Sequence, residues 1–265
     1  MSLSLKAKLL SNEPVGPEIF LLTLQAPAMA AKARPGQFVM LRVSPGPDPL
    51  LARPFSIHGA DGGKLLILYQ VKGKGTKLLT QACPGSELLT WGPLGRGFDL
   101  TAERPLLVAG GMGVAPIAFA IEYLCNKFDE VRLLCGVAGT VRHEALIKLF
   151  AGRLGSARVK IRYSSEDGSI GRKGLVTDLL KEHFSTSQPL KPDTVLACGP
   201  LPMLKAVALL CAEFEVACQT SLEAPMACGV GACLGCAIPA AGGGYLRACQ
   251  EGPVMEASLV DWEKI

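Results

Sequence analysis

The sequence predicts a multidomain protein: an antiparallel β-barrel domain, then an α/β domain with a doubly wound parallel sheet, then a small Cys-rich domain. Two observations predict the first two domains, because short β-rich runs fill the first hundred residues and strands alternate with helices from about residue 103. The third observation is a Cys- and Gly-rich segment at 224–249, which could not build a core alone. We therefore expect domains at residues 1–101, 102–220 and 221–265.

The first domain is predicted from three β-rich runs, FVMLRV (38–43), PFSIHG (54–59) and KLLILYQVK (64–72). Turns rich in proline and glycine, such as SPGPDP, separate these runs. Several short strands at this spacing are typical of an antiparallel barrel or sandwich. One helix, GTKLLTQA (75–82), is expected to interrupt them.

The second domain is predicted from four strand–helix repeats with apolar strands. The expected strands are PLLVAGG (105–111), VRLLCGVA (131–138), RVKIRYSS (158–165) and DTVLACG (193–199). The expected helices are APIAFAIEYLC (115–125), HEALIKLF (143–150), VTDLLKEHF (176–184) and LPMLKAVALLCAEF (201–214). The uncharged stretch 105–121 is interrupted by glycines and a proline and is shorter than the roughly 20 residues of a membrane span, so we expect a buried strand, turn and helix there.

Composition narrows the class of function. The 265 residues include 27 Lys and Arg against 23 Asp and Glu, a net charge of +4, and no basic run stands out. A nucleic-acid or membrane-surface partner therefore has no support. Ten cysteines without an apolar leader at the N-terminus indicate a reducing compartment, so we expect a cytoplasmic protein. Six of them are expected to be mostly small buried hydrophobes: Cys83, Cys125, Cys135, Cys198, Cys211 and Cys218.

The strongest motif is C-x4-C-x2-C-x12-C, formed by Cys228, Cys233, Cys236 and Cys249. This is the spacing of plant-type [2Fe–2S] clusters. Glycines at 229, 231 and 235 are expected to relieve crowding and to permit positive φ, so that backbone N–H groups can reach the cluster sulfurs. Structural zinc and unliganded thiols are the alternatives, although zinc ribbons usually pair two C-x2-C knuckles.

Two Gly-rich strand ends favour a dinucleotide site. AGGMGVAPI (109–117) joins an apolar strand to a helix, whose N-terminus could face a phosphate. ACGPLPML (197–204) ends the last parallel strand, and ligands of doubly wound sheets bind outside the carboxyl ends of strands. Neither stretch contains G-x-G-x-x-G, and tight packing is the alternative explanation of the glycines.

A second phosphate site is predicted in the β-rich half. ARPFS (52–56) places an arginine on a strand, and KGKGTKLL (72–79) leads a Gly-rich turn into a helix. Arg53 and the helix start at Gly75 and Thr76 could together clamp a diphosphate. The alternative is an arginine at a solvated strand edge. No Ser/His/Asp arrangement is evident, and we expect His143 and His183 at the surface or in satisfied contacts.

In chain order, RPFS, GKGT, GGMGVAP and CGP-x-PM resemble the motifs of the ferredoxin–NADP reductase superfamily, over about residues 4–255. The appended cysteine motif, followed by GPV (252–254), is similar to the electron-transfer subunit family of NAD-dependent (class 1B) dihydroorotate dehydrogenase. The resemblance implies a flavin-binding barrel, a nicotinamide-binding domain and a [2Fe–2S] domain. The cofactors it implies are FAD, a [2Fe–2S] cluster and NAD.

The resemblance also assigns residues to each cofactor. For FAD it implies Arg53, Pro54, Phe55, Ser56, Leu68, Tyr69, Gln70, Gly75 and Thr76. For NAD it implies Gly110, Gly111, Gly113, Cys198, Gly199 and Pro200. It puts Glu223 near the flavin, and His58, which follows RPFS, is a candidate to line that site. The four clustered cysteines are the implied metal ligands, and no catalytic residue for dihydroorotate is expected on this chain.

The implied function is that of an NAD-dependent oxidoreductase subunit in pyrimidine biosynthesis. Electrons would pass from the FMN of a dihydroorotate dehydrogenase catalytic subunit through the [2Fe–2S] cluster and FAD to NAD+, because FAD can exchange both single electrons and hydride. That FMN-containing subunit would be the partner, in a heterotetramer with two copies of each chain. The alternatives are the same module in a ferredoxin–NADP oxidoreductase, hydrogenase or sulfite reductase, a free-standing flavin reductase, or a binding module with a zinc-stapled tail.

Overall fold

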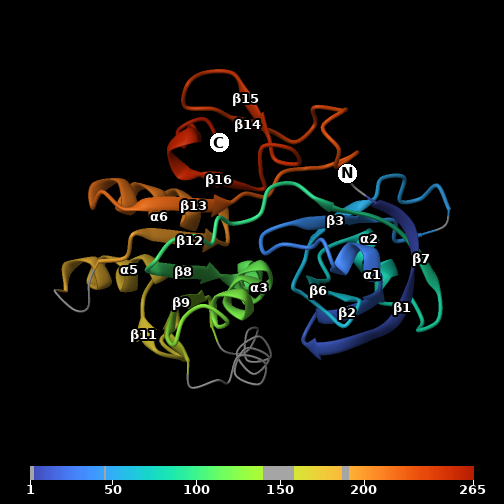
Figure 1. Cartoon of the computed structure of the whole chain (residues 1–265), viewed down its shortest axis with the longest axis horizontal. Coiled ribbons are helices and arrows are strands. Elements are labelled where there is room, and N and C mark those ends of the chain that lie inside the picture. The colour runs from blue at the N-terminus through green and yellow to red at the C-terminus, as the bar shows by residue number, and fades with distance from the viewer. Residues whose placement is uncertain (1–2, 45, 140–157, 187–190) are drawn as a thin grey trace.

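The computed structural model describes residues 3–44, 46–139, 158–186 and 191–265. The helix predicted at 143–150, with His143, lies outside the described residues. Figure 1 shows two large bodies side by side, an N-terminal β body and an α/β body, with the C-terminal segment lying along both. The predicted order of a β domain followed by an α/β domain is confirmed.

The N-terminal body is one antiparallel sheet of seven strands in the order β4-β3-β7-β1-β2-β6-β5. Its strands are β1 (Leu3–Gly16), β2 (Ile19–Gln25), β3 (Phe38–Leu41), β4 (Arg53–Ser56), β5 (Gly59–Asp61), β6 (Lys64–Gln70) and β7 (Glu87–Leu94). The sheet curls, because β4 near one end packs against β6 near the other. Its interior is filled by alternate apolar side chains, which include Leu22, Leu24, Val39, Leu65 and Ile67. Two short helices, α1 (Pro27–Ala30) and α2 (Lys74–Leu79), complete this body, and α2 confirms the helix predicted after the third β-rich run.

The second body is a sheet in the order β11-β10-β9-β8-β12-β13-β16, parallel except for its last strand. The strands are β8 (Pro105–Gly110), β9 (Val131–Val137), β10 (Val159–Ser165), β11 (Arg172–Lys173), β12 (Thr194–Cys198), β13 (Ala217–Ser221) and β16 (Val254–Glu256). The helices are α3 (Val114–Leu124), α5 (Val176–Ser185) and α6 (Leu201–Glu213).

Helices cover both faces of this sheet, as the prediction of a doubly wound fold requires. In β8, Leu107 packs in the core that contains α3, whereas Leu106 and Val108 pack in the core that contains α5 and α6. Alternate residues of a strand point to opposite faces, so an uninterrupted apolar strand is the pattern that two covered faces demand. The uncharged stretch 105–121 thus forms β8, a 3-10 turn (Gly111–Gly113) and most of α3. In the described part of the chain, no helix is long and apolar enough to cross a membrane.

The C-terminal segment joins the two bodies. It leaves the sheet after β13, forms the hairpin β14 (Ala237–Pro239) and β15 (Tyr245–Arg247), and returns to pair β16 antiparallel with β13. On the other side, the indole N–H of Trp91 in β7 donates a hydrogen bond to the carbonyl of Cys228 at 3.0 Å. Cys236 and Cys249 are buried in the same core as Met40 of β3. The segment therefore depends on both bodies for its core, in line with its composition.

Candidate functional site

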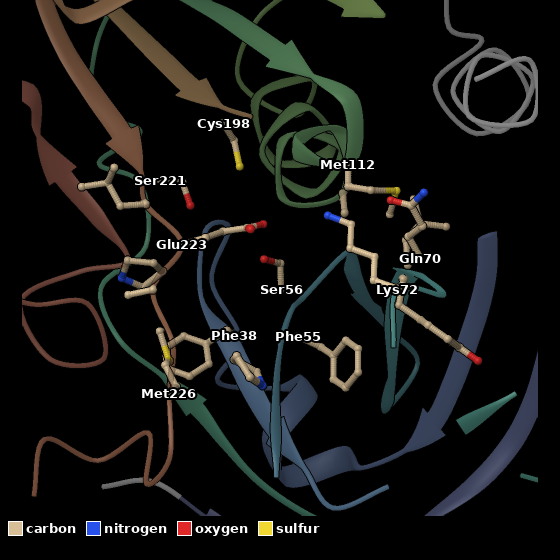
Figure 2. A pocket seen from close by; sticks show the side chains of 17 residues that line it. Phe38, Phe55, Ser56, Gln70, Lys72, Met112, Cys198, Ser221, Glu223 and Met226 are labelled. Carbon is tan, nitrogen blue, oxygen red and sulfur yellow. The ribbon is translucent and has the colours of Figure 1, made fainter. Parts of the chain in front are cut away.

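A cavity of about 250 Å³ lies where the barrel, the parallel sheet and the C-terminal segment meet. Figure 2 shows side chains from all three parts pointing into it. Six residues predicted to contact FAD line it: Pro54, Phe55, Ser56, Leu68, Tyr69 and Gln70. Strands β4 and β6 supply these residues; they stand near opposite ends of the sheet order but pack against each other, so the two motifs form one wall.

The barrel side of this cavity is built on a packed group of aromatic rings. Tyr69 stacks on Phe20 with ring centroids 5.6 Å apart and meets Phe55 edge-on at 5.8 Å. Its hydroxyl donates a hydrogen bond to Asn12 Oδ1 at 3.1 Å, and burial raises the pKa of this phenol to about 12. Tyr69 is therefore a neutral structural ring that fixes Phe55, and the polar contacts on this side come from Ser56, Gln70 and Lys72.

Two of the three residues predicted to clamp a diphosphate, Arg53 and Gly75, lie side by side, whereas Thr76 is engaged elsewhere. A Cβ added to Gly75 would lie 3.1 Å from Nε of Arg53, so the RPFS arginine lies directly beside the Gly-rich turn. The Arg53 guanidinium donates to the carbonyl of Leu51 at 2.6 Å. The Thr76 hydroxyl is committed to the turn itself, because it accepts hydrogen bonds from the N–H groups of Lys72 and Gly73. We therefore expect Thr76 to shape the turn, and Arg53 to supply the charge next to it.

The opposite wall consists of the carboxyl ends of two parallel strands. Cys198 ends β12, Ser221 ends β13, and the chain after β13 adds Glu223. Burial, and to a smaller extent the nearby Glu223 carboxylate, raises the pKa of the Cys198 thiol to about 12, although a hydrogen bond with the Ser221 hydroxyl opposes the shift, so this cysteine is a neutral thiol in contact with Ser221. Figure 2 shows Glu223 pointing into the cavity opposite Ser56 and Lys72.

A second cavity, of about 540 Å³, adjoins the first. The residues predicted to contact NAD line it, except Cys198, which lines the first cavity: Gly110, Gly111, Gly113, Gly199 and Pro200. Four residues line both cavities: Gln70, Lys72, Met112 and Glu223. Two ligands held in these cavities would therefore meet at a shared wall.

A third cavity, of about 390 Å³, continues from the second at Gly110, Gly111 and Pro200. It lies at the carboxyl ends of β8, β9 and β10, and the end of β10 contributes Ser164 and the exposed Glu166. The second and third cavities together form a long groove across the end of the parallel sheet, where dinucleotides bind in folds of this class.

The four motif cysteines gather as two pairs. Cys236 Sγ lies 3.2 Å from Cys249 Sγ, and the Cys233 thiol is hydrogen-bonded to Cys228 Sγ. In the described residues, no group of three or more His, Cys, Asp or Glu side chains is arranged to hold one metal ion. Two thiol pairs fit the two irons of a [2Fe–2S] cluster, which takes four cysteines, better than one tetrahedral zinc, which needs all four around one point.

Backbone N–H groups already point at these sulfurs. Gly231 N–H donates to Cys249 Sγ at 3.1 Å, and Val230 N–H donates to Cys228 Sγ at 3.4 Å. Burial opposes ionisation of Cys228, but hydrogen bonds from the N–H groups of Val230, Cys233 and Ala232 outweigh it and lower its pKa to about 6. A thiolate is the form that binds metal, so the loop is prepared for a cluster.

Two family models match the chain. Residues 107–208 match the oxidoreductase NAD-binding domain, and residues 223–261 match the iron–sulfur cluster binding domain of dihydroorotate dehydrogenase B. The electron transfer subunit of dihydroorotate dehydrogenase B (NAD(+)) from Desulforamulus reducens is 38% identical over 99% of this chain and 100% of its own length. The corresponding subunit of Caldanaerobacter subterraneus is 40% identical over 98% of this chain and 99% of its own.

The chain belongs to the family of dihydroorotate dehydrogenase B electron transfer subunits. Among solved structures, it is similar to the NADH-dependent reduced ferredoxin–NADP oxidoreductase, with a TM-score of 0.81 and 25% identity over 98% of this chain and 91% of that one. The ferredoxin–NADP+ reductase of Plasmodium falciparum shares the fold, with a TM-score of 0.61 and 14% identity over 80% of this chain and 91% of that one. The predicted family, superfamily fold and cofactor set are confirmed.

Several residues of the electron transfer subunit that line the first cavity were not predicted from the motifs. Lys72 precedes one Gly-rich turn and Met112 lies inside the other, while Ser221 and Met226 lie on the chain around Glu223. Ser221 had a weak signal in the sequence, because ACQTSLE is a short run between the last predicted helix and the Cys-rich segment; the structure makes it a strand whose carboxyl end falls at the same edge as Cys198. The other three carry no pattern of their own and are selected only by the fold.

His58 has a different place from the one expected. It is buried and is not among the residues that line the first cavity. Its Nδ1 lies 3.0 Å from the carbonyl oxygen of Ala115 at the start of α3. Since His58 belongs to the barrel and Ala115 to the NAD-binding domain, this ring ties together the two domains that form the cavity.

The cluster loop of the electron transfer subunit carries its strain on an unexpected residue. Gly229 and Gly231 have the predicted positive φ, +71° and +80°, but Gly235 does not. The left-handed position instead falls on Leu234, with φ of +58°. This conformation costs a residue with a Cβ about 1–2 kcal/mol, and the Leu234 side chain is 63% exposed.

Proposed function

We propose that this chain carries electrons between NAD and an FMN-containing dihydroorotate dehydrogenase catalytic subunit, with no dihydroorotate site of its own. The observation that supports this most directly is the shared wall of the first and second cavities, formed by Gln70, Lys72, Met112 and Glu223. It allows a flavin in the first cavity and a nicotinamide in the second to touch. We also propose a cytoplasmic location, which is supported by ten free cysteines.

When bound, FAD supplies conversion between hydride and single electrons, and the [2Fe–2S] cluster supplies one-electron exchange. In this proposal, Pro54, Phe55, Ser56 and Gln70 would hold the flavin ring, and Arg53 beside Gly75 would hold its diphosphate. Gly110, Gly111 and Gly199 face the NAD diphosphate. The four motif cysteines hold the cluster close to the barrel through the Trp91 contact.

Among the residues of the shared wall, we assign proton transfer to Glu223. Its exposed carboxylate lines both cavities and would hold or move, between the cavity and water, the proton that accompanies two-electron exchange between a nicotinamide and a flavin. Cys198 remains a neutral thiol because burial raises its pKa to about 12, so it neither repels hydride nor competes for that proton. Ser221 holds the Cys198 thiol in place.

The proposal is tested by reconstitution with the catalytic subunit from the same genome. The purified chain is expected to contain flavin and iron, to be reduced by NADH, and to leave dihydroorotate untouched when alone. With the catalytic subunit added, dihydroorotate should reduce NAD+. Oxidation of dihydroorotate by the isolated chain, or zinc in place of iron in folded protein, would overturn the proposal. Reduced ferredoxin as donor tests the alternative complex.

Glu223→Gln is expected to slow reduction of the flavin by NADH roughly 10- to 100-fold, the usual contribution of a positioned acid or base. Flavin content and thermal stability should stay at the wild-type level, because Glu223 is exposed and outside the core. Anaerobic stopped-flow absorbance measures the rate. Glu213→Gln, at an exposed position of α6, is the matched control. Equal rates in Glu223→Gln and wild type would exclude the proton role.

Glu166→Ser is expected to improve the use of NADPH. Glu166 lies at the end of β10 in the groove that continues from the Gly-rich turn, where an acidic residue accepts a hydrogen bond from the ribose 2′-hydroxyl and repels a 2′-phosphate. We expect the ratio of kcat/KM for NADPH to that for NADH to rise on the order of tenfold, from loss of like-charge repulsion. Steady-state reduction of ferricyanide measures both substrates. An unchanged ratio would place the ribose elsewhere.

A further inference from the structure

Leu234 combines a strained backbone with an exposed apolar side chain. Among the residues that the structure describes, three non-glycine residues have positive φ, namely Glu18, Glu215 and Leu234, and only Leu234 is apolar. The Leu234 side chain is 63% exposed within this chain, so its burial stabilises the fold too little to offset the backbone strain. The same loop uses glycine at its other left-handed positions, and glycine here would be unstrained. A strained residue that its own fold does not need points to a contact outside the chain.

The segment around Leu234 lacks charge altogether. From 224 to 246 there is no Asp, Glu, Lys or Arg, and two further apolar residues are exposed there, Val230 at 44% and Tyr245 at 75%. Depletion of charge together with exposed aliphatic and aromatic side chains is the composition of an interface core. Val230 adjoins the ligand Cys228, and Leu234 adjoins the exposed ligand Cys233. Val230 and Leu234 therefore lie beside cluster ligands, and Arg247, which donates to the carbonyl of Gly231 at 3.4 Å, is neutralised by an ion pair with Glu251.

We infer that Leu234 is the anchor by which this chain seats on the dihydroorotate dehydrogenase catalytic subunit, and that it fills an apolar pocket of that partner beside the cluster ligands. The inference rests on the proposed function and specifies where the partner binds. Val230 forms the second contact of the same surface. Electrons that enter the cluster from a partner must cross the outward side of this loop, so the surface and the electron path share one location.

The chemistry of the surface favours a permanent subunit over a transient carrier. Short-lived electron-transfer complexes bury little surface, and charge complementarity speeds their encounter. A 23-residue segment without charge, bordered by the mutually neutralised pair Arg247–Glu251, offers little to steer such an encounter, whereas obligate interfaces are more apolar. A second copy of this chain would set two identical clusters against each other without an electron donor. The catalytic subunit is the occupant that fits both the apolar surface and the need for a redox group.

Leu234→Gly separates docking from folding, because it should weaken binding of the catalytic subunit without lowering the stability of this chain. In the isolated full-length chain with FAD and cluster bound, relief of the left-handed strain should leave the melting temperature equal or higher, by up to about 3 °C. Flavin content, iron content and reduction of ferricyanide by NADH should match the wild type. The Kd for the catalytic subunit should rise at least tenfold, and transfer from dihydroorotate to NAD+ at low subunit concentration should fall in parallel.

Two substitutions provide matched controls. Glu215→Gly removes a positive-φ side chain far from the cluster, at the end of α6, and should change neither Kd nor electron transfer. Leu209→Ser removes a leucine that is 53% exposed on α6, and should also leave docking unchanged. Leu234→Met, which keeps an apolar side chain, should restore most of the affinity. If Leu234→Gly fails to retain its cluster, Leu234→Asn serves instead, since asparagine tolerates this backbone region.

Calorimetric titration in low and high salt gives the decisive result. Weakened binding of Leu234→Gly with unchanged iron content, at an affinity that salt barely alters, supports the inference. Unchanged Kd for Leu234→Gly overturns it and leaves the proposed function standing. A loss of affinity that follows the loss of iron in both Leu234→Gly and Leu234→Asn would also overturn it, because Leu234 would then only protect the cluster. Absence of binding by the wild-type chain would overturn the proposed function and the inference together.

Discussion

Cys236→Ala is expected to abolish electron exchange with the catalytic subunit while leaving reduction of the flavin by NADH close to wild type. Cys236 is buried, and its Sγ lies 3.2 Å from that of Cys249, so its removal breaks one of the two thiol pairs. A [2Fe–2S] cluster requires four cysteine ligands. We expect the iron content to fall to background and transfer between dihydroorotate and NAD+ to fall on the order of 100-fold or more, since loss of outer partners alone can cost 10- to 100-fold.

The control for Cys236→Ala is Cys83→Ser, because Cys83 is an exposed cysteine outside the motif. It should retain iron and full transfer. Iron is measured by colorimetric assay and the reduced cluster by electron paramagnetic resonance, and the flavin signal provides an internal standard. If Cys236→Ala retained iron and transferred electrons at the wild-type rate, the motif would not be the ligand set.

Local sequence patterns were sufficient to predict most of the strands and motifs that position the site. The apolar strands at 105–111 and 193–199 are buried on both faces, which requires a parallel sheet, and ligands then bind at the carboxyl ends of such strands. The cysteine spacing is equally local, because Cys228, Cys233 and Cys236 lie within nine residues. These features depend on backbone geometry over short stretches, so they can be recognised without the fold.

The features that escaped prediction depend on pairing between distant segments. Strand β16 has only three residues, and it becomes a strand because Gln219, Thr220 and Ser221 offer it an open edge. Strands β1 and β2 lie outside the predicted β-rich runs, and β1 alone bridges β2 and β7. Met112 and Lys72 belong to the shared wall only because the barrel meets the parallel sheet there.

In the cluster loop, the sequence did not predict which residue adopts the left-handed backbone. Three glycines predict three flexible positions, yet the third left-handed position falls on Leu234 rather than on Gly235. Gly229 and Gly231 are required for space as well as for φ, since an added Cβ would lie 2.5 Å from Met40 and from Gln250 respectively. Sequence identifies which residues permit an unusual backbone, but the structure decides which residue adopts it. The departure at Leu234 is informative for this reason.

Gly113→Ala is expected to destabilise the chain and to weaken NADH binding, because it forces a steric clash inside the NAD-binding domain. A Cβ at Gly113 would lie 2.1 Å from the carbonyl oxygen of Cys198 and 2.6 Å from the backbone nitrogen of Gly199. Neither atom can move freely, because Cys198 is paired with Ala109 inside the sheet. The turn at 111–113 must therefore shift away from β12, at a cost of roughly 1–3 kcal/mol or more.

That shift would widen the second cavity between Gly113 and Gly199, which both line it, so we expect the KM for NADH to rise at least tenfold while the cluster and its iron stay intact. The melting temperature should fall by about 2–4 °C for each kcal/mol lost. Gly242→Ala is the matched control, since its added Cβ meets nothing within 4 Å and its φ is not positive. Differential scanning fluorimetry and steady-state kinetics measure the two effects. A Gly113→Ala variant as stable as Gly242→Ala, with an unchanged KM, would show that the close approach of this turn to β12 does not shape the nucleotide site.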